Sequence, residues 1–122
     1  YRLHHVISVD RNKRLVRISG SAKAGHWLRW VTRDADTAKA QALEKLNAVT
    51  SAQPPEFALM FPNISRGAEF FGGVDEDLRA FQKTFPDTPM VGFYGNAEIA
   101  PGNELSGLIR HHSCVVNLFF EQ

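Results

Sequence analysis

A lone carboxylate among glycines and aromatic residues is the first sign of chemistry in this sequence. The stretch GFYGNAEIAP, residues 92–101, follows an apolar run and contains Glu98. A strand that only packs against its neighbours needs no such carboxylate. Earlier in the chain, the loop PNISRG, residues 62–67, also follows an apolar run and contains Arg66. A guanidinium and a carboxylate at one site can hold a ligand that carries both charges, such as an amino acid, because the arginine donors form a fork that fits a carboxylate.

The elements around these two loops should bring them together. Residues 57–61 (FALMF) form an unbroken apolar run that is typical of a central strand covered on both faces. A helix over residues 74–84 follows, and residues 90–94 form the next strand. Such a unit makes a right-handed crossover, so we expect the two strands to be parallel. Their C-terminal ends then lie at one edge of the sheet, where open α/β sheets bind ligands.

The rest of the chain supplies further strands and a first helix. We expect hairpin strands over residues 3–9 and 14–20, a third strand over residues 26–34, a helix capped by Asp34 or Asp36, and a last strand over residues 111–120. The resulting order, β-β-β-α-β-α-β-β, predicts an α+β fold with a mixed β-sheet and two main helices. A length of 122 residues fits a single domain spanning residues 1–122.

Two apolar stripes indicate which helix faces are buried. Leu43, Leu46 and Val49 repeat at helical spacing in the first helix. In the second helix, Val74, Leu78, Phe81 and Phe85 form a second stripe with spacings of three and four residues. We therefore expect Phe81 to be buried against the sheet.

The two strand exits define the candidate ligand site. Its residues are Asn63, Ser65 and Arg66 after the first strand, and Gly92, Tyr94, Asn96 and Glu98 after the second. An alternative is that Arg66 and Glu98 pair with each other, since pairing is how buried charges usually survive. Glycines at strand ends can likewise serve only as turns. The sequence leaves both interpretations open.

Histidine and cysteine give little support for other chemistry. His4 and His5 lie on the first strand and His111 and His112 on the last, but consecutive residues of a strand point to opposite faces. At most one of each pair can join a given site, so we expect no metal and no cofactor. Cys114 shares a strand face with His112, yet two residues along a strand is too far for a good nucleophile–base contact, and a thiol in an apolar run is more often core.

Composition excludes several classes of function. The net charge is +1 and the basic residues are scattered, which argues against nucleic-acid binding. No apolar run is long enough to span a bilayer and no signal peptide is visible, so we expect neither membrane insertion nor secretion. A single cysteine fits a reducing compartment. The chain begins with Tyr1, so we expect it to be a fragment of a longer protein.

Several segments together resemble the C-terminal domain of the FIST family, named for F-box and intracellular signal transduction. They are FALMFPNISRG, the helix VDEDLRAFQKTFPDTP, MVGFYGNAEIAP and the terminal HHSCVVNLFF. The resemblance covers most of the chain, and GFYGNAEI is its most specific part. Two positions depart from the family pattern. Asn63 stands where the family often has a cysteine, which removes thiol chemistry from that loop. Ala97 stands where a glycine precedes the acid, which gives the backbone beside Glu98 less freedom.

The resemblance implies a cytoplasmic, non-catalytic sensory domain that binds a small polar ligand, with an amino acid as the candidate. Family members occur with signalling modules in bacteria and with F-box domains in eukaryotes. The resemblance adds Gly67, Phe93 and Ser113 to the ligand site and supports Arg66, Gly92 and Glu98. It also implies two partners, namely the FIST N-terminal domain, which can share the pocket, and an unknown signalling output. The alternatives are a protein-interaction domain without a small ligand, using a strand edge or the second helix, and a hydrolase-type enzyme with Glu98 or His112 as base.

Overall fold

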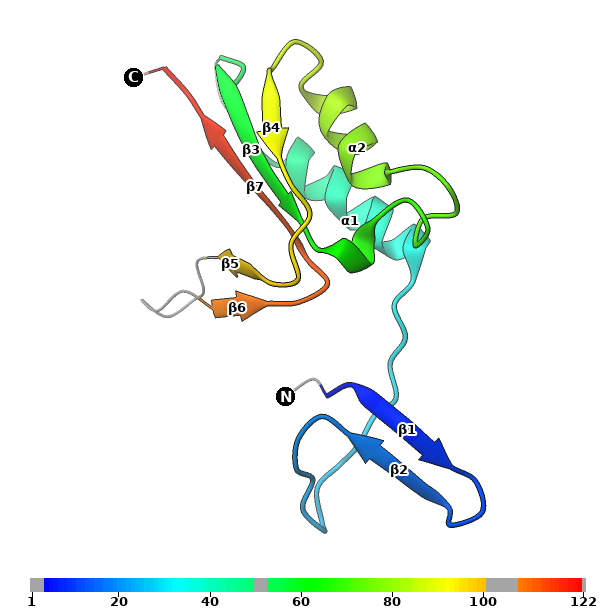
Figure 1. The fold of residues 1–122 in the computed structure, drawn as a ribbon. Coiled ribbons are helices and arrows are strands. Elements are labelled where there is room, and N and C mark those ends of the chain that lie inside the picture. Colours follow the sequence, from blue (N-terminus) through cyan, green and yellow to red (C-terminus); the bar gives the residue numbers. More distant parts are fainter. Residues whose placement is uncertain (1–3, 50–52, 101–107, 122) are drawn as a thin grey trace. The chain divides into compact units, whose positions relative to one another are not determined.

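The computed structural model describes residues 4–49, 53–100 and 108–121, and these residues form two compact units (Figure 1). The first unit spans residues 1–32 and the second spans residues 33–122. Each unit is described here by itself.

The first unit contains one hairpin. Strands β1 (Val6–Asp10) and β2 (Leu15–Ile18) pair antiparallel. The turn between them is fixed by Asp10, whose carboxylate accepts a hydrogen bond from the Lys13 amide at 3.0 Å. The strand expected over residues 26–34 is wrong, because no part of that segment is in a strand. Its alternating pattern is not enough, because a strand also needs a neighbour to pair with, and none of the described strands pairs with it.

The second unit contains both helices and the remaining strands. In chain order they are α1 (Ala35–Asn47), β3 (Phe57–Pro62), the short 3₁₀ helix η1 (Ile64–Arg66), α2 (Glu76–Thr84), β4 (Met90–Gly92), β5 (Glu98–Ala100), β6 (Leu108–Arg110) and β7 (Cys114–Phe119). The α+β class, with a mixed sheet and two main helices, is therefore confirmed. The order differs in that the hairpin β5–β6 takes the place of a simple loop before the last strand.

The main sheet has the order β4-β3-β7 (Figure 1). Strands β3 and β4 are parallel, as the crossover argument predicted, and β7 runs antiparallel to β3. The parallel pairing resumes beyond β4, where Asn63 bridges to Gly95. The exits of β3 and β4 therefore lie at one end of the sheet, which is the geometry that the candidate site requires.

Both helices begin at an aspartate. Asp34 caps α1 by accepting the Thr37 amide at 2.7 Å, and this hydrogen bond lowers the pKa of the Asp34 carboxyl. Asp75 caps α2 by accepting the Leu78 amide at 3.0 Å. These contacts satisfy backbone amides that have no partner within the helix.

The core lies between the helices and one face of the sheet. It is formed by Leu46, Ala58, Met60, Ala80 and Phe81. Phe81 is 1% exposed, which confirms its expected burial. At one end of each stripe the predicted burial is wrong, because Val49 and Val74 are exposed. Val49 lies beyond the last residue of α1, and Val74 precedes the cap of α2, so neither follows the helical period.

Among the described residues, no helix lies on the opposite face of the sheet (Figure 1), so β3 is not covered on both faces as the sequence predicted. Both helices pack on the face of Ala58 and Met60. On the other face, Phe57 stacks on Phe119 with ring centroids 4.2 Å apart. Phe93 on the same face is 70% exposed. The unbroken apolar run therefore correctly predicted a strand at β3, but this strand is less buried than the run suggested.

Gly92 is required by the close approach of β4 to β3. A Cβ atom at this position would lie 1.7 Å from the carbonyl oxygen of Met60. The neighbouring atom belongs to the backbone, so it has little freedom to move. This glycine is explained by packing and needs no ligand.

Gly92→Ala should destabilise the domain by about 3 kcal/mol or more, because the clash is with a strand rather than with a flexible side chain. Gly67→Ala is the matched control, since its Cβ would meet only the Ile64 carbonyl at an ordinary 3.5 Å. Urea unfolding of both variants checks the expectation. A Gly92→Ala protein as stable as the control would show that β4 can shift away from β3.

Candidate functional site

Asn63 is the centre of a buried polar cluster at the exits of β3 and β4. Its side chain is 3% exposed. Its amide nitrogen donates to the Asn96 carbonyl at 2.9 Å and to Glu98 Oε1 at 2.8 Å. Its amide oxygen accepts from the Ser65 backbone N–H at 3.1 Å and from Ser65 Oγ at 2.6 Å. We call Asn63, Ser65, Glu98, His112 and Ser113 the Asn63 cluster.

Glu98 is held inside this cluster and not by Arg66. It is the first residue of β5 and is 3% exposed. Its two carboxylate oxygens accept one bond each, from Asn63 and from Ser113 Oγ at 2.6 Å. A carboxylate at this strand end therefore joins β5 to the exit of β3 and to the residue before β7. This contact accounts for the carboxylate that stood out in the sequence.

Hydrogen positions in the cluster follow from the partners of Ser65. Its hydroxyl lies 2.6 Å from the Asn63 amide oxygen and 2.6 Å from His112 Nδ1. The Asn63 orientation is fixed, because its nitrogen faces two acceptors. The single hydroxyl proton must then go to Asn63, which can only accept through its oxygen. For both contacts to be hydrogen bonds, His112 must then donate from Nδ1 to Ser65.

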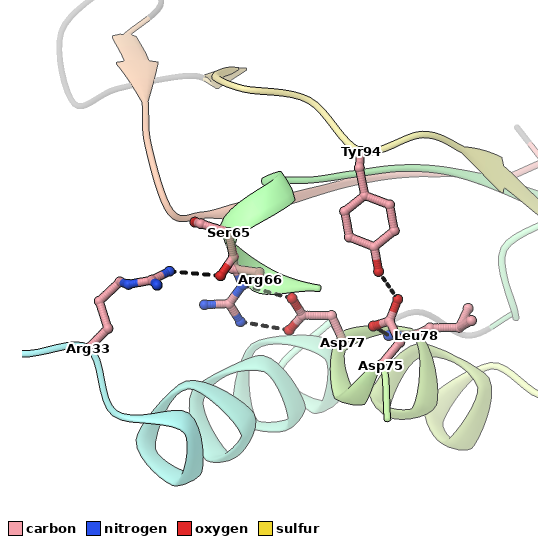
Figure 2. A network of polar contacts seen from close by, with 7 residues as sticks. All are labelled: Arg33, Ser65, Arg66, Asp75, Asp77, Leu78 and Tyr94. Atoms are coloured by element: carbon pink, nitrogen blue, oxygen red, sulfur yellow. Dashed lines mark hydrogen bonds and ion pairs between the residues drawn. The ribbon is translucent and has the colours of Figure 1, made fainter. Parts of the chain in front are cut away.

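Arg66 pairs with Asp77 on α2 rather than with Glu98 (Figure 2). Its Nε donates to Asp77 Oδ2 at 2.7 Å and its Nη2 to Oδ1 at 2.6 Å. Both side chains are largely buried. The hydrogen bond with Asp77 raises the pKa of the Arg66 guanidinium. This two-point contact attaches η1 to the first turn of α2.

Two further contacts surround this pair (Figure 2). Tyr94 donates its hydroxyl proton to Asp75, the residue that caps α2. Partial burial, with this hydrogen bond and the nearby carboxylates, raises the pKa of Tyr94. Arg33 donates to the Ser65 carbonyl at 2.8 Å and lies over the Phe70 ring. The exit of β4 is thus tied to the start of α2, and the segment before α1 is tied to the loop after β3.

A groove of about 430 Å³ opens between α1 and β7. Its walls come from one face of α1 and from alternate residues of β7, together with Met60. These walls are mostly apolar but include Gln41 and Lys45, and the far end of the groove is formed by Arg66, Asp77, His112 and Ser113. The α1 residues are Ala38, Gln41, Ala42, Lys45 and Leu46, followed by Val49, and the β7 residues are Cys114, Val116 and Leu118. We call this feature the α1–β7 groove.

The structure separates the predicted site residues into three places. Arg66 and Ser113 line the α1–β7 groove. Asn63, Ser65 and Glu98 belong to the Asn63 cluster, to which Asn96 contributes its backbone carbonyl. The other four residues lie outside the groove and the cluster: Gly67 follows η1, Gly92 is the last residue of β4, and Phe93 and Tyr94 come directly after it.

Sequence reasoning missed two groove residues of note. Asp77 stood out only as an acidic residue in the first turn of a helix, although it is the partner of Arg66. Lys45 lies on α1, across the groove from β7. The only sequence signal for this groove wall was the helical stripe of small and apolar residues on α1. Sequence reasoning had no means to place α1 beside β7, because the sheet order is not visible in the sequence.

Cys114 and the histidines were the remaining candidates for chemistry in the sequence. Burial raises the pKa of Cys114 to about 12, so the thiol stays protonated at neutral pH. Among residues 4–49, 53–100 and 108–121, no three His, Cys, Asp or Glu side chains are grouped so that they could hold a metal ion. None of the helices in these ranges has the length and apolar character needed to cross a membrane.

Comparison with known proteins places the chain in a family. The model of the FIST C domain matches residues 1–101. The chain belongs to the FIST C domain family. This match confirms the resemblance inferred from the motifs. The family is associated with signal transduction. The matched range ends before β6, so Ser113 and β7 lie outside it.

Two relatives carry the name F-box only protein 22, one from Homo sapiens and one from Pongo abelii. Each is 35% identical to this FIST C domain over 77 residues, which is 61% of this chain and 18% of the relative. The chain thus corresponds to less than a fifth of the length of these relatives.

Replacing Arg66 with lysine should cost about 1.5–3 kcal/mol of stability, because lysine cannot make the two-point contact with Asp77. Arg66→Ala should cost about 3–5 kcal/mol, since it leaves a buried carboxylate without its partner. Arg79→Ala is the control, because its contact with Glu76 is long, at 3.4 Å, and exposed. Denaturant unfolding measures all three. A loss for Arg66→Ala no larger than for the control would contradict a structural role for the pair.

Substitution of Glu98 should separate lost hydrogen bonds from lost charge. Glutamine keeps an oxygen for Asn63, and its nitrogen can donate to Ser113, so Glu98→Gln should cost about 1 kcal/mol. Alanine leaves two buried donors without acceptors, and each such group costs about 1–3 kcal/mol. Thermal and urea unfolding of the two variants gives the comparison. Equal losses would mean that the charge, and not the hydrogen bonding, is what the fold uses.

Proposed function

We propose that this FIST C domain is a non-catalytic sensor of a signal transduction protein and that it binds a small ligand in the α1–β7 groove. The observation that carries the proposal is the groove itself. Its volume of about 430 Å³ falls within the range of about 300–1,000 Å³ that is usual for small-molecule sites. Apolar walls with a few polar groups at one end are also typical of such sites.

The polar end of the groove favours an amino acid with an apolar side chain. Arg66 uses Nε and Nη2 for Asp77, and in the contacts described for it Nη1 is left with two N–H groups that suit a carboxylate. Ser113 donates its proton to Glu98, so its oxygen can accept from an ammonium group. An apolar side chain would lie along Leu46, Val116 and Leu118.

The proposed ligand site differs from the site expected from the sequence in the role of Glu98. Glu98 does not line the groove, so it would act on the ligand through Ser113 and not directly. The proposed contacts therefore come from Arg66 and Ser113, with Glu98 as a positioning residue.

The state of the possible nucleophiles supports a role without catalysis. The Ser65 proton is given to Asn63, and the Cys114 thiol is kept protonated by burial. A hydrolase using either group would need a base that lowers the pKa of the nucleophile or removes its proton. The arrangement around both groups supports binding instead.

The family membership supports a cellular setting for this sensor. We place it in the cytoplasm, next to a FIST N-terminal domain and upstream of a signalling output. Both relatives are named F-box only protein 22, and on that basis we propose that the output of this domain is a protein partner.

The groove can be tested by filling it. Ala38→Phe adds a ring on the groove side of α1, whereas Ala40→Phe adds the same ring at an exposed position of the same helix and is the matched control. In a thermal-shift screen of amino acids, a ligand at 100 times its Kd should stabilise the wild type by about 2.7 kcal/mol. We expect Ala38→Phe to lose this shift and Ala40→Phe to keep it. A wild-type melting temperature that no amino acid raises, or a shift that survives Ala38→Phe, would count against the groove as an amino-acid site.

The second candidate is a protein-interaction domain without a small ligand. The helix-free face of the sheet favours it, because Val91 and Phe93 are 65% and 70% exposed. Exposed apolar groups gathered on one face mark interaction sites more often than chance. Under this alternative, the filled and unfilled groove variants would behave alike toward every small molecule tested.

A further inference from the structure

We propose that the free edge of β7 pairs antiparallel with β7 of a second copy of this chain. Within the described part of the chain, β7 is an outer strand of the sheet β4-β3-β7, and β3 is the only strand paired with it there. The proposal does not depend on a ligand in the groove, and its test is therefore independent of the proposed function.

The register between β3 and β7 shows which backbone groups face the free edge. The Asn63 amide donates to the Ser113 carbonyl at 2.8 Å, so Ser113 faces β3. Facing residues of an antiparallel pair alternate between bonded and non-bonded. The non-bonded positions are Cys114, Val116 and Leu118, opposite Pro62, Met60 and Ala58. Proline has no N–H, which agrees with a non-bonded pair at Pro62. The N–H and C=O groups of Cys114, Val116 and Leu118 therefore point to the free edge.

This edge lacks the features that normally prevent strand pairing. Natural edge strands are protected by charged residues, proline, bulges or short length. Strand β7 has six residues, CVVNLF, with no charge and no proline, and its register against β3 has no shift. By contrast β4, at the other edge, has only three residues.

The same strand is complementary to itself under a two-fold axis. With Val116 opposite Val116 of the second copy, Cys114 lies opposite Leu118 of that copy and Leu118 opposite Cys114. These are three bonded pairs, and each exchanges two hydrogen bonds. No like charges face each other, and the net charge of +1 gives little repulsion between copies.

The pairing would also bring a second copy to the α1–β7 groove. Cys114, Val116 and Leu118 direct their side chains to the groove. Directly opposed residues of paired strands share a face, so the same three residues of the second copy would lie next to the groove. The result is one continuous sheet, β4-β3-β7-β7-β3-β4, with a groove that both copies line.

Sedimentation equilibrium of the 122-residue protein tests the association. We expect a dimer for the wild type and a monomer for Val116→Pro, which removes the central N–H of the edge without breaking a bond to β3. Phe93→Ser is the control, because it changes the exposed sheet face and leaves the edge intact. A monomeric wild type, a dimer that survives Val116→Pro, or a dimer that only Phe93→Ser disrupts would each overturn the proposal.

Amide hydrogen exchange gives a second readout. It uses the wild type alone, so it does not depend on whether Val116→Pro folds. The amides of Cys114, Val116 and Leu118 should become protected as the protein concentration rises. Those of Val115 and Asn117 face β3, so their protection should not depend on concentration. Fast exchange of the first set at every concentration would overturn the proposal as well.

Discussion

The buried amide of Asn63 is the interaction on which the loop region depends. It accepts from Ser65 and donates to Asn96 and Glu98, so one side chain fixes η1, the segment after β4 and the start of β5. All of its donor and acceptor positions are used, and a buried group left without a partner would cost about 1–3 kcal/mol. The two strand exits are therefore held together through one hydrogen-bonded side chain.

The carboxylates of Asp77 and Glu98 are stabilised by different kinds of partner, and they hold different parts of the structure together. Asp77 is paired with Arg66 by two charge-assisted bonds, which fix α2 to the loop after β3. Glu98 accepts from two neutral groups, Asn63 and Ser113, which leaves the guanidinium to Asp77. A single arginine cannot present the same fork to both acids. The pairing with Asp77 keeps Arg66 at the end of the groove, where its remaining nitrogen is available for an anion.

Local pattern and chain connectivity predicted the fold well where both apply. Two parallel strands with their exits at one end were predicted from the apolar run of β3, the stripe that contains Phe81 and the crossover, and they are observed. Prediction failed where the structure of a segment depends on contacts with residues far away in the sequence. The alternating segment 26–34 pairs with no described strand, and the partner of Arg66 came from a helix rather than from the neighbouring loop. The candidate site was predicted as a set of polar residues, but which of them line a groove depends on the placement of α1 beside β7.

The groove owes its existence to small residues on α1. Ala38 and Ala42 occupy the helix face toward β7, where leucine at either position would fill much of the space. A fold selected only for stability would fill it, because buried apolar volume contributes about 0.8 kcal/mol for each methylene group. Helix propensity does not require alanine at these positions, since leucine forms helices nearly as well. The alanines therefore keep open a space that packing alone would close. This space lies beside the edge of β7 and ends at Arg66, so the proposed ligand site and the proposed strand pairing both concern the side of the sheet that carries β7.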